Sequence, residues 1–249
     1  MSRPCFMRTS LIRDPLIRGL SLGPVVGMVV LVVAAMSARL LAQQTDGSRA
    51  ASTAVVTFTL DFPQSDPEHY LMAVDTAGHA RFECTGKVAE NSEAQTYQTE
   101  FEVSAGNRER VFGLAKQAQY FAGKIDSGNR KVAFTGTKIL SYQDGQRSIT
   151  AKYNYSSLPA VQQLTALFQS MASTLEYGRR LAYYHRYQKL ALDEELKHME
   201  EQAKNGQLSE IQGVAPVLEA IVEDSSVINV VRARAKELIE MGSAAAARH

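Results

Sequence analysis

Cysteine is scarce in this sequence, which has two cysteines in 249 residues. Cys5 precedes a long apolar run, so it is not the lipid-bearing cysteine that follows such a run in lipoproteins. If the N-terminal segment is removed, Cys84 stands alone and no intramolecular disulfide can form. The fold must then be stabilised by its core. Roughly 200 residues suffice for that, because chains of this size bury ~70% of their unfolded surface.

Motifs of known catalytic and cofactor chemistry are missing as well. The sequence contains no Gly-x-Gly-x-x-Gly, no P-loop, no His-Glu-x-x-His and no Cys-x-x-Cys. We therefore expect no cofactor, and the sequence favours a protein without catalytic activity over an enzyme.

Excess positive charge is absent from the body of the chain. Of 27 basic and 26 acidic residues, residues 1–42 hold five basic ones and Asp14, which leaves 22 basic and 25 acidic residues beyond them. Nucleic-acid binding needs clustered cations, so we expect no nucleic-acid partner.

An uncharged apolar run does occur at residues 19–36, and four arginines precede it. A basic segment followed by an apolar run is typical of an export signal. The run is longer than most signal-peptide cores and just long enough to span a bilayer. We therefore expect residues 1–42 to be either a signal peptide, cleaved after Ala42, or a retained anchor that contacts the membrane through residues 19–36. Residues 43–52 are polar and linker-like, and the protein is predicted to be periplasmic, secreted or anchored.

Alternating apolar residues predict strands between residues 53 and 155. We expect strands at 54–62, 70–74, 79–84 and 96–103, and then a helix capped by Ser104 and ended by Gly123. A hairpin follows, with Asp144-Gly145 as a two-residue turn that pairs Leu140 with Ile149 and Tyr142 with Arg147.

The rest of the chain is predicted to be helical. Apolar residues at three-four spacing start at Val161 and predict one long helix to about Ala203, with a second cap at Asp193 as an alternative. A helical pair is expected at 204–242, ended by Gly242, with a disordered tail at 243–249. The fold class is therefore α+β: an antiparallel sheet of about five or six strands with helices packed on one face, in a domain spanning 53–203, then the helical pair.

The most unusual local composition lies at residues 177–189, where tyrosines alternate with cations. Such a segment can bind an anionic polymer, a glycan or lipid headgroups. Alternatively, its tyrosines pack on the sheet and its arginines pair with nearby acids. The candidate ligand-binding residues are Arg179, Arg180, Tyr183, Tyr184, His185, Arg186 and Tyr187.

Other candidate sites are weaker. His69 and His79 are expected about 16 Å apart along a hairpin, too far to share a metal ion. Glu195 and His198 have the spacing of di-iron ligands, but the sequence has no second such pair. Cys84 shares a strand face with Phe82, which predicts a buried thiol and not a nucleophile. We predict no metal site.

The run from DPEHYLMAVDTAGHARFEC through FTGTKILSYQDGQRSITAKYNYSSLPAVQQLTALFQSM to TLEYGRRLAYYHRY resembles uncharacterised exported proteins of environmental bacteria. The resemblance covers about residues 65–190. It implies export and a strand–helix–strand–helix order for a domain of unknown function, and it implies no activity or site.

Three functions stay open from the sequence. The first is a non-catalytic binding or scaffold module of the cell envelope, with an anionic envelope polymer or a protein as partner. The second is an envelope hydrolase whose site is formed by Asp61, Asp66, Glu68 and His69, close to a strand end and a turn. The third is an oligomer that associates through the helical segment 161–203.

Overall fold

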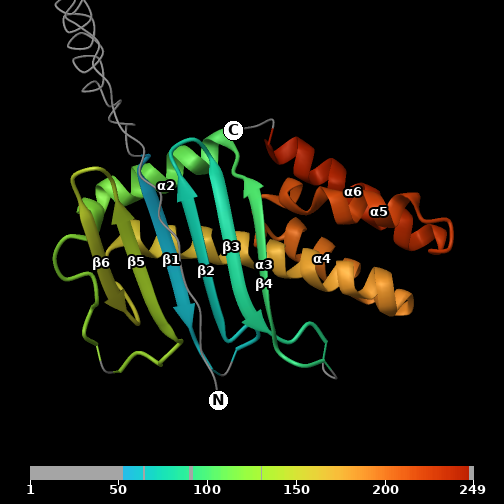
Figure 1. Cartoon of the computed structure of the whole chain (residues 1–249), viewed down its shortest axis with the longest axis horizontal. Helices are drawn as coiled ribbons and strands as arrows, with labels where there is room; N and C mark the ends of the chain where they lie inside the picture. Colours follow the sequence, from blue (N-terminus) through green and yellow to red (C-terminus); the bar gives the residue numbers. More distant parts are fainter. Residues whose placement is uncertain (1–52, 64, 90–91, 130, 247–249) are drawn as a thin grey trace, which may run out of the picture. The chain divides into compact units, whose positions relative to one another are not determined.

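The computed structural model describes residues 53–246 except for 64, 90–91 and 130 (Figure 1). The predicted leader (1–42) and linker (43–52) lie outside the described residues, as do residues 247–249. The sheet and the C-terminal helices belong to one compact unit. None of the helices in this part of the chain is both long and apolar enough to cross a bilayer.

Six antiparallel strands form one sheet with the order β4-β3-β2-β1-β5-β6. The strands are β1 (Val55–Asp61), β2 (His69–Asp75), β3 (His79–Gly86), β4 (Gln95–Glu102), β5 (Thr137–Gln143) and β6 (Ser148–Tyr153). Alternate residues of β1, β2, β3 and β5 are buried, as a sheet covered on one face requires. The structure confirms the predicted α+β class.

Two helices, α2 (Ala105–Gln117) and α3 (Pro159–Tyr187), cover one face of the sheet (Figure 1). The core lies between them and the strands, where the ring of Phe168 on α3 stacks on that of Phe58 on β1 at 5.5 Å. Helix α3 crosses the strands. Its Thr165 bonds Tyr153 of β6, and its Arg179 reaches the end of β3. The last turns of α3 therefore extend past the β4 edge of the sheet (Figure 1).

Two predicted details of the β-rich half are wrong. Helix α2 is capped by Ser104 as predicted, but it ends at Gln117, and the short helix η1 (Gln119–Phe121) follows it. Left-handed φ angles at all three η1 residues turn Phe121 into the core. The β5–β6 hairpin pairs Leu140 with Ala151, because Asp144 accepts hydrogen bonds from the backbone N–H groups of Gln146 and Arg147 and so extends the turn.

The predicted continuous helix from Val161 to Ala203 is also wrong, because the chain folds back after Tyr187. At Gln188 the backbone leaves the helical region with φ −145° and ψ 59°. A short helix η2 (Lys189–Ala191) then leads into α4 (Leu192–Lys204). Helix α4 packs against α3, with Leu192, Leu196 and Met199 buried. The two helices form an antiparallel hairpin in which Gln202 lies near Gln169 and Ser173.

The C-terminal helical pair is confirmed, with different limits. It consists of α5 (Ala215–Glu223) and α6 (Asn229–Ala246), and the short helix η3 (Ile211–Val214) precedes it. The sequence predicts a stop at Gly242, but α6 continues through it. A Cβ atom at Gly242 would lie 3.2 Å from the Ile211 side chain. The glycine therefore permits close packing of α6 on η3 instead of ending the helix.

Candidate functional site

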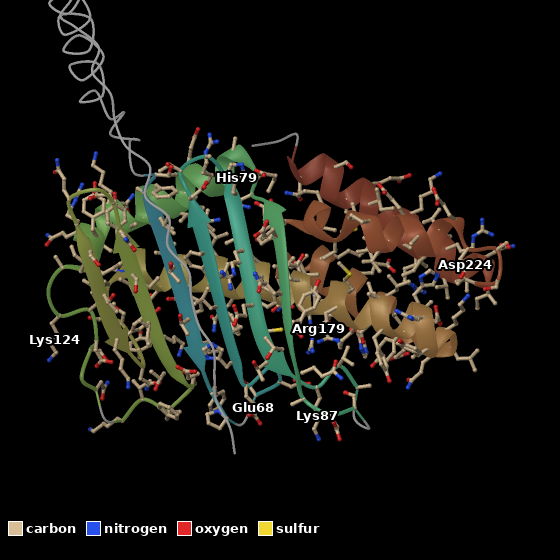
Figure 2. All side chains as sticks on the ribbon, viewed as in Figure 1. Glu68, His79, Lys87, Lys124, Arg179 and Asp224 are labelled. Atoms are coloured by element: carbon tan, nitrogen blue, oxygen red, sulfur yellow. The ribbon has the colours of Figure 1, made fainter. Side chains whose placement is uncertain are left out.

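Arg179, the first of the predicted ligand-binding residues, points from α3 towards the sheet and not to solvent (Figure 2). Its guanidinium donates to Oε2 of Glu176 at 2.8 and 3.0 Å and to the carbonyl oxygens of Gly86 and Lys87 at 3.2 and 2.7 Å. Both charged side chains of this ion pair are buried. Arg179 therefore ties the end of β3 to α3, and its charge is compensated inside the protein.

Arg180 is likewise paired within the fold. Its Nε donates to Glu195 on α4 at 2.6 Å, and its guanidinium lies 4.7 Å from the ring centre of Tyr177. The pair holds the two helices of the α3–α4 hairpin together. Like Arg179, Arg180 is committed to a carboxylate, which is the structural role that the sequence offered as the alternative to ligand binding.

His185 and Lys189 share one carboxylate, that of Asp224, which follows α5. The His185 Nε2 and Lys189 Nζ atoms lie 2.9 and 2.5 Å from Oδ2 of Asp224. Hydrogen bonds from Lys189, from the hydroxyl and N–H of Ser226 and from His185 hold the pKa of Asp224 well below its usual range. These contacts fix the end of α3 to the α5–α6 loop.

The aromatic residues of the segment lie at the end of α3. The Tyr183 ring contacts those of Tyr184 and Tyr187, with centroids 5.8 and 5.2 Å apart. The Arg186 guanidinium lies 5.2 Å from the Tyr187 ring and forms no ion pair with any described residue. Of the predicted ligand-binding residues, Arg186 and Tyr187 are exposed, whereas the others are buried or half-buried.

Four large apolar side chains are exposed at the end of the helical part that lies beyond the sheet, and we call them the tip patch. They are Tyr187, Leu190, Ile228 and Val230, with exposed fractions of 62%, 98%, 62% and 53%. Two come from the α3–α4 turn and two from the start of α6. Lys189 joins these segments through Asp224 and Ser226, and Figure 2 shows Asp224 at this end.

A cavity of about 270 Å³, which we call the α3 pocket, lies between the β1–β2 loop and the α3–α4 hairpin. Its walls combine hydroxyl, amide and carboxyl groups with tyrosine rings. The lining residues are Leu60, Ser65, Asp66, Pro67, Tyr70, Gln169, Ala172, Ser173, Glu176, Tyr177, Arg180 and Gln202. The 3.6-residue helical repeat places Gln169, Glu176 and Arg180 on the same face of α3 as Tyr187, so the pocket and the tip patch share a side of that helix.

The four residues of the predicted hydrolase site do not converge. Asp61 and His69 contact each other at 2.5 Å, at paired positions of β1 and β2 whose neighbours Leu60 and Tyr70 face the helices. Asp61 and His69 therefore lie on the opposite face of the sheet. Asp66 lines the α3 pocket, and Glu68 is exposed on the loop (Figure 2).

Cys84 is buried, and its thiol donates to Oε1 of Glu176 at 2.9 Å. Burial and the neighbouring Glu176 carboxylate raise the pKa of this thiol far above its ordinary value, so the thiol stays protonated at neutral pH. A protonated buried thiol is a poor nucleophile.

The predicted metal-ligand candidates all have other partners. His69 pairs with Asp61, His79 with Asp75, Glu195 with Arg180 and His198 with Glu194. Across the described residues, no group of three or more histidine, cysteine, aspartate or glutamate side chains is arranged to hold a metal ion.

Comparison with known proteins adds no assignment, because no family model and no curated protein matches this chain. The resemblance to exported proteins of environmental bacteria stays a prediction.

The tip patch and the α3 pocket are not indicated by the sequence. Leu190 and Ile228 lie beside other apolar residues in the sequence, so no local pattern marks them as exposed, and contacts of Lys189 with Asp224 and Ser226 join their segments only in the folded chain. The pocket combines a loop, two strands and two helices, which no local pattern reveals. The apolar stripe of the predicted long helix is interrupted between Leu181 and Leu192, and this interruption is the sequence feature that indicates the helix break.

Proposed function

We propose that this protein is an exported, non-catalytic binding module of the cell envelope, and that a protein partner docks on its tip patch. The observation that carries the proposal is the exposure of Tyr187, Leu190, Ile228 and Val230 at one end of the molecule. Large apolar side chains gathered at one site on a surface are typical of protein–protein contacts, whereas single ones are ordinary. A tyrosine with a neighbouring arginine is the composition of a binding hot spot.

The charges of the same region favour a protein over an anionic polymer. Arg179, Arg180 and Lys189 all pair with carboxylates, and among the described residues Arg186 is the cation of the segment that has no ion pair. A single exposed cation gives little attraction for a polyanion once salt screens it. Binding through the tip patch is therefore expected to persist at high salt.

The experiment is photocrosslinking in the organism that produces the protein. A photoreactive phenylalanine analogue replaces Leu190 in the full chain, and the same analogue replaces Lys152 on the opposite edge of the sheet as a control. We expect one adduct of defined mass from position 190 and none from position 152. Equal patterns from the two positions, or none from either, would contradict docking at the tip.

The mass of the adduct also distinguishes the remaining alternative, an oligomer of this chain. An adduct of twice the chain mass identifies a second copy as the partner, and light scattering on residues 43–249 would then show a dimer.

Mass spectrometry of the mature N-terminus together with cell fractionation tests export. A start at Gln43 in the soluble fraction means release, an intact leader means anchoring, and an intact chain in the cytoplasm contradicts export.

A further inference from the structure

Two buried tyrosines line the α3 pocket without using their hydroxyl groups. Tyr70 on β2 and Tyr177 on α3 are each only 5% exposed, and neither hydroxyl has a hydrogen-bond partner among the described residues. Tyr153 lies on the same face of the sheet, and its hydroxyl meets that of Thr165 at 2.5 Å. Neither hydroxyl is among the fully buried polar atoms that lack a partner, so both remain accessible and can hydrogen-bond a ligand in the pocket.

The charge of the pocket is set by Asp66. Glu176 is neutralised by Arg179, and Arg180 is neutralised by Glu195. Asp66 forms no hydrogen bond or ion pair with any described residue, and its Oδ1 lies so close to Gly86 that a Cβ atom there would be only 2.6 Å away. The glycine thus makes room for a free carboxylate at the pocket, which disfavours anions.

Size and lining restrict the ligand further. The cavity of about 270 Å³ is smaller than the ~300–1,000 Å³ of pockets for drug-sized molecules. Its serine, glutamine and tyrosine side chains can exchange hydrogen bonds with several hydroxyl groups, and tyrosine rings can pack against an apolar ring face. We propose that the α3 pocket binds one sugar unit that is neutral or carries an amino group. This site is independent of docking at the tip patch.

Isothermal titration calorimetry with glucosamine, N-acetylglucosamine and glucuronate tests the proposal. The wild-type protein, as residues 43–249, is expected to bind glucosamine and N-acetylglucosamine with dissociation constants of up to about 10 mM, and not to bind glucuronate. Tyr177→Phe removes one hydroxyl and is expected to lower the affinity for both sugars roughly 3- to 10-fold. Asp66→Asn is expected to lower the affinity for glucosamine roughly tenfold or more, and the affinity for N-acetylglucosamine by less. The reason is that a charge-assisted hydrogen bond from the amino group to Asp66 is stronger than a neutral one.

A filling variant provides a second, independent test. Ser173 is exposed and lines the pocket, so Ser173→Phe should abolish binding without unfolding the helix. The matched controls are Ala182→Phe, an exposed position on another face of α3, and Glu68→Gln, an exposed acid of the same loop. The proposal is overturned if neither sugar binds, if glucuronate binds as well as glucosamine, or if Ser173→Phe and Asp66→Asn bind like the wild type.

Discussion

Glu210 completes the cap of a helix that begins 105 residues earlier in the chain. Its carboxylate accepts hydrogen bonds from the backbone N–H and the hydroxyl of Ser104, at 3.0 and 2.7 Å, and from the Asn107 side chain at 2.6 Å. Ser104 is the N-cap of α2, so the negative charge also lies at the positive end of that helix. Glu210 is buried and has a left-handed backbone with φ 62°. The contact joins the C-terminal helices to the α+β part.

We expect Glu210→Ala to destabilise the fold by about 2–4 kcal/mol, because it leaves three partly buried donors without an acceptor. Ser104→Ala should cost about 1 kcal/mol as the loss of an ordinary cap. The two losses should not add, since both variants remove the same hydrogen bond. Urea unfolding of the single and double variants measures this, and strict additivity would contradict a shared cap.

The buried pair of Glu176 and Arg179 gives a second prediction. Arg179→Met leaves the Glu176 carboxylate without its cation and should cost about 3–5 kcal/mol. Glu176→Leu combined with Arg179→Met removes both charges, and the stability of this double variant should lie closer to that of the wild type. Urea unfolding again provides the test. A loss below about 1 kcal/mol for Arg179→Met would show that the pair is not a structural ion pair.

Alanine substitution at two helical glycines should change the stability of the fold in opposite directions. A Cβ atom at Gly178 of α3 would overlap Cγ1 of Val214, whereas one at Gly113 of α2 would meet nothing within 4 Å. Gly178→Ala is therefore expected to cost about 1–3 kcal/mol by overpacking. Gly113→Ala should gain about 0.5–1 kcal/mol from helix propensity. Thermal melts of the two variants measure both effects, and a Gly178→Ala protein at least as stable as the wild type would contradict the packing of η3 on α3.

Much of the fold could be predicted from the sequence because its signals are local. The alternation of Val56, Phe58 and Leu60 marks a half-buried strand, and Ser104 marks a helix start. The break at Gln188 has no glycine or proline to mark it, and only the interruption of the apolar stripe indicates it in the sequence. It is stabilised by contacts across the turn, such as that of Arg180 with Glu195.

The candidate site was only partly predictable for the same reason. Residue types at 179–187 indicated aromatic rings and cations, but whether each cation is free depends on distant partners. Asp224 lies 39 residues from His185 in the chain, and it is the carboxylate that engages His185 and Lys189. Pairings over such distances leave no periodic pattern in a sequence.

The Asp224 contacts predict a dependence of stability on pH. A carboxyl group whose pKa is lower in the folded than in the unfolded protein stabilises the fold above its unfolded pKa, near ~4, and this contribution is lost as the pH falls towards the folded pKa. Below about pH 4, the wild type should therefore lose stability more steeply than Asp224→Asn. Urea unfolding over a pH series checks this. Lys189→Met, which removes the largest contributor to the low pKa, should show a smaller slope than the wild type, and parallel curves for all three proteins would contradict the assignment.

The most direct test of the central claim, that the tip patch is one docking surface, uses a crosslinker at a second position within it. The photoreactive residue replaces Val230 on α6, and Leu190→Ser is introduced on the other side of the patch. The account predicts the same adduct from position 230 as from position 190, strongly reduced by Leu190→Ser and unchanged by the control Lys152→Ser. An adduct from position 230 that survives Leu190→Ser, or one with a different mass, would contradict a single surface.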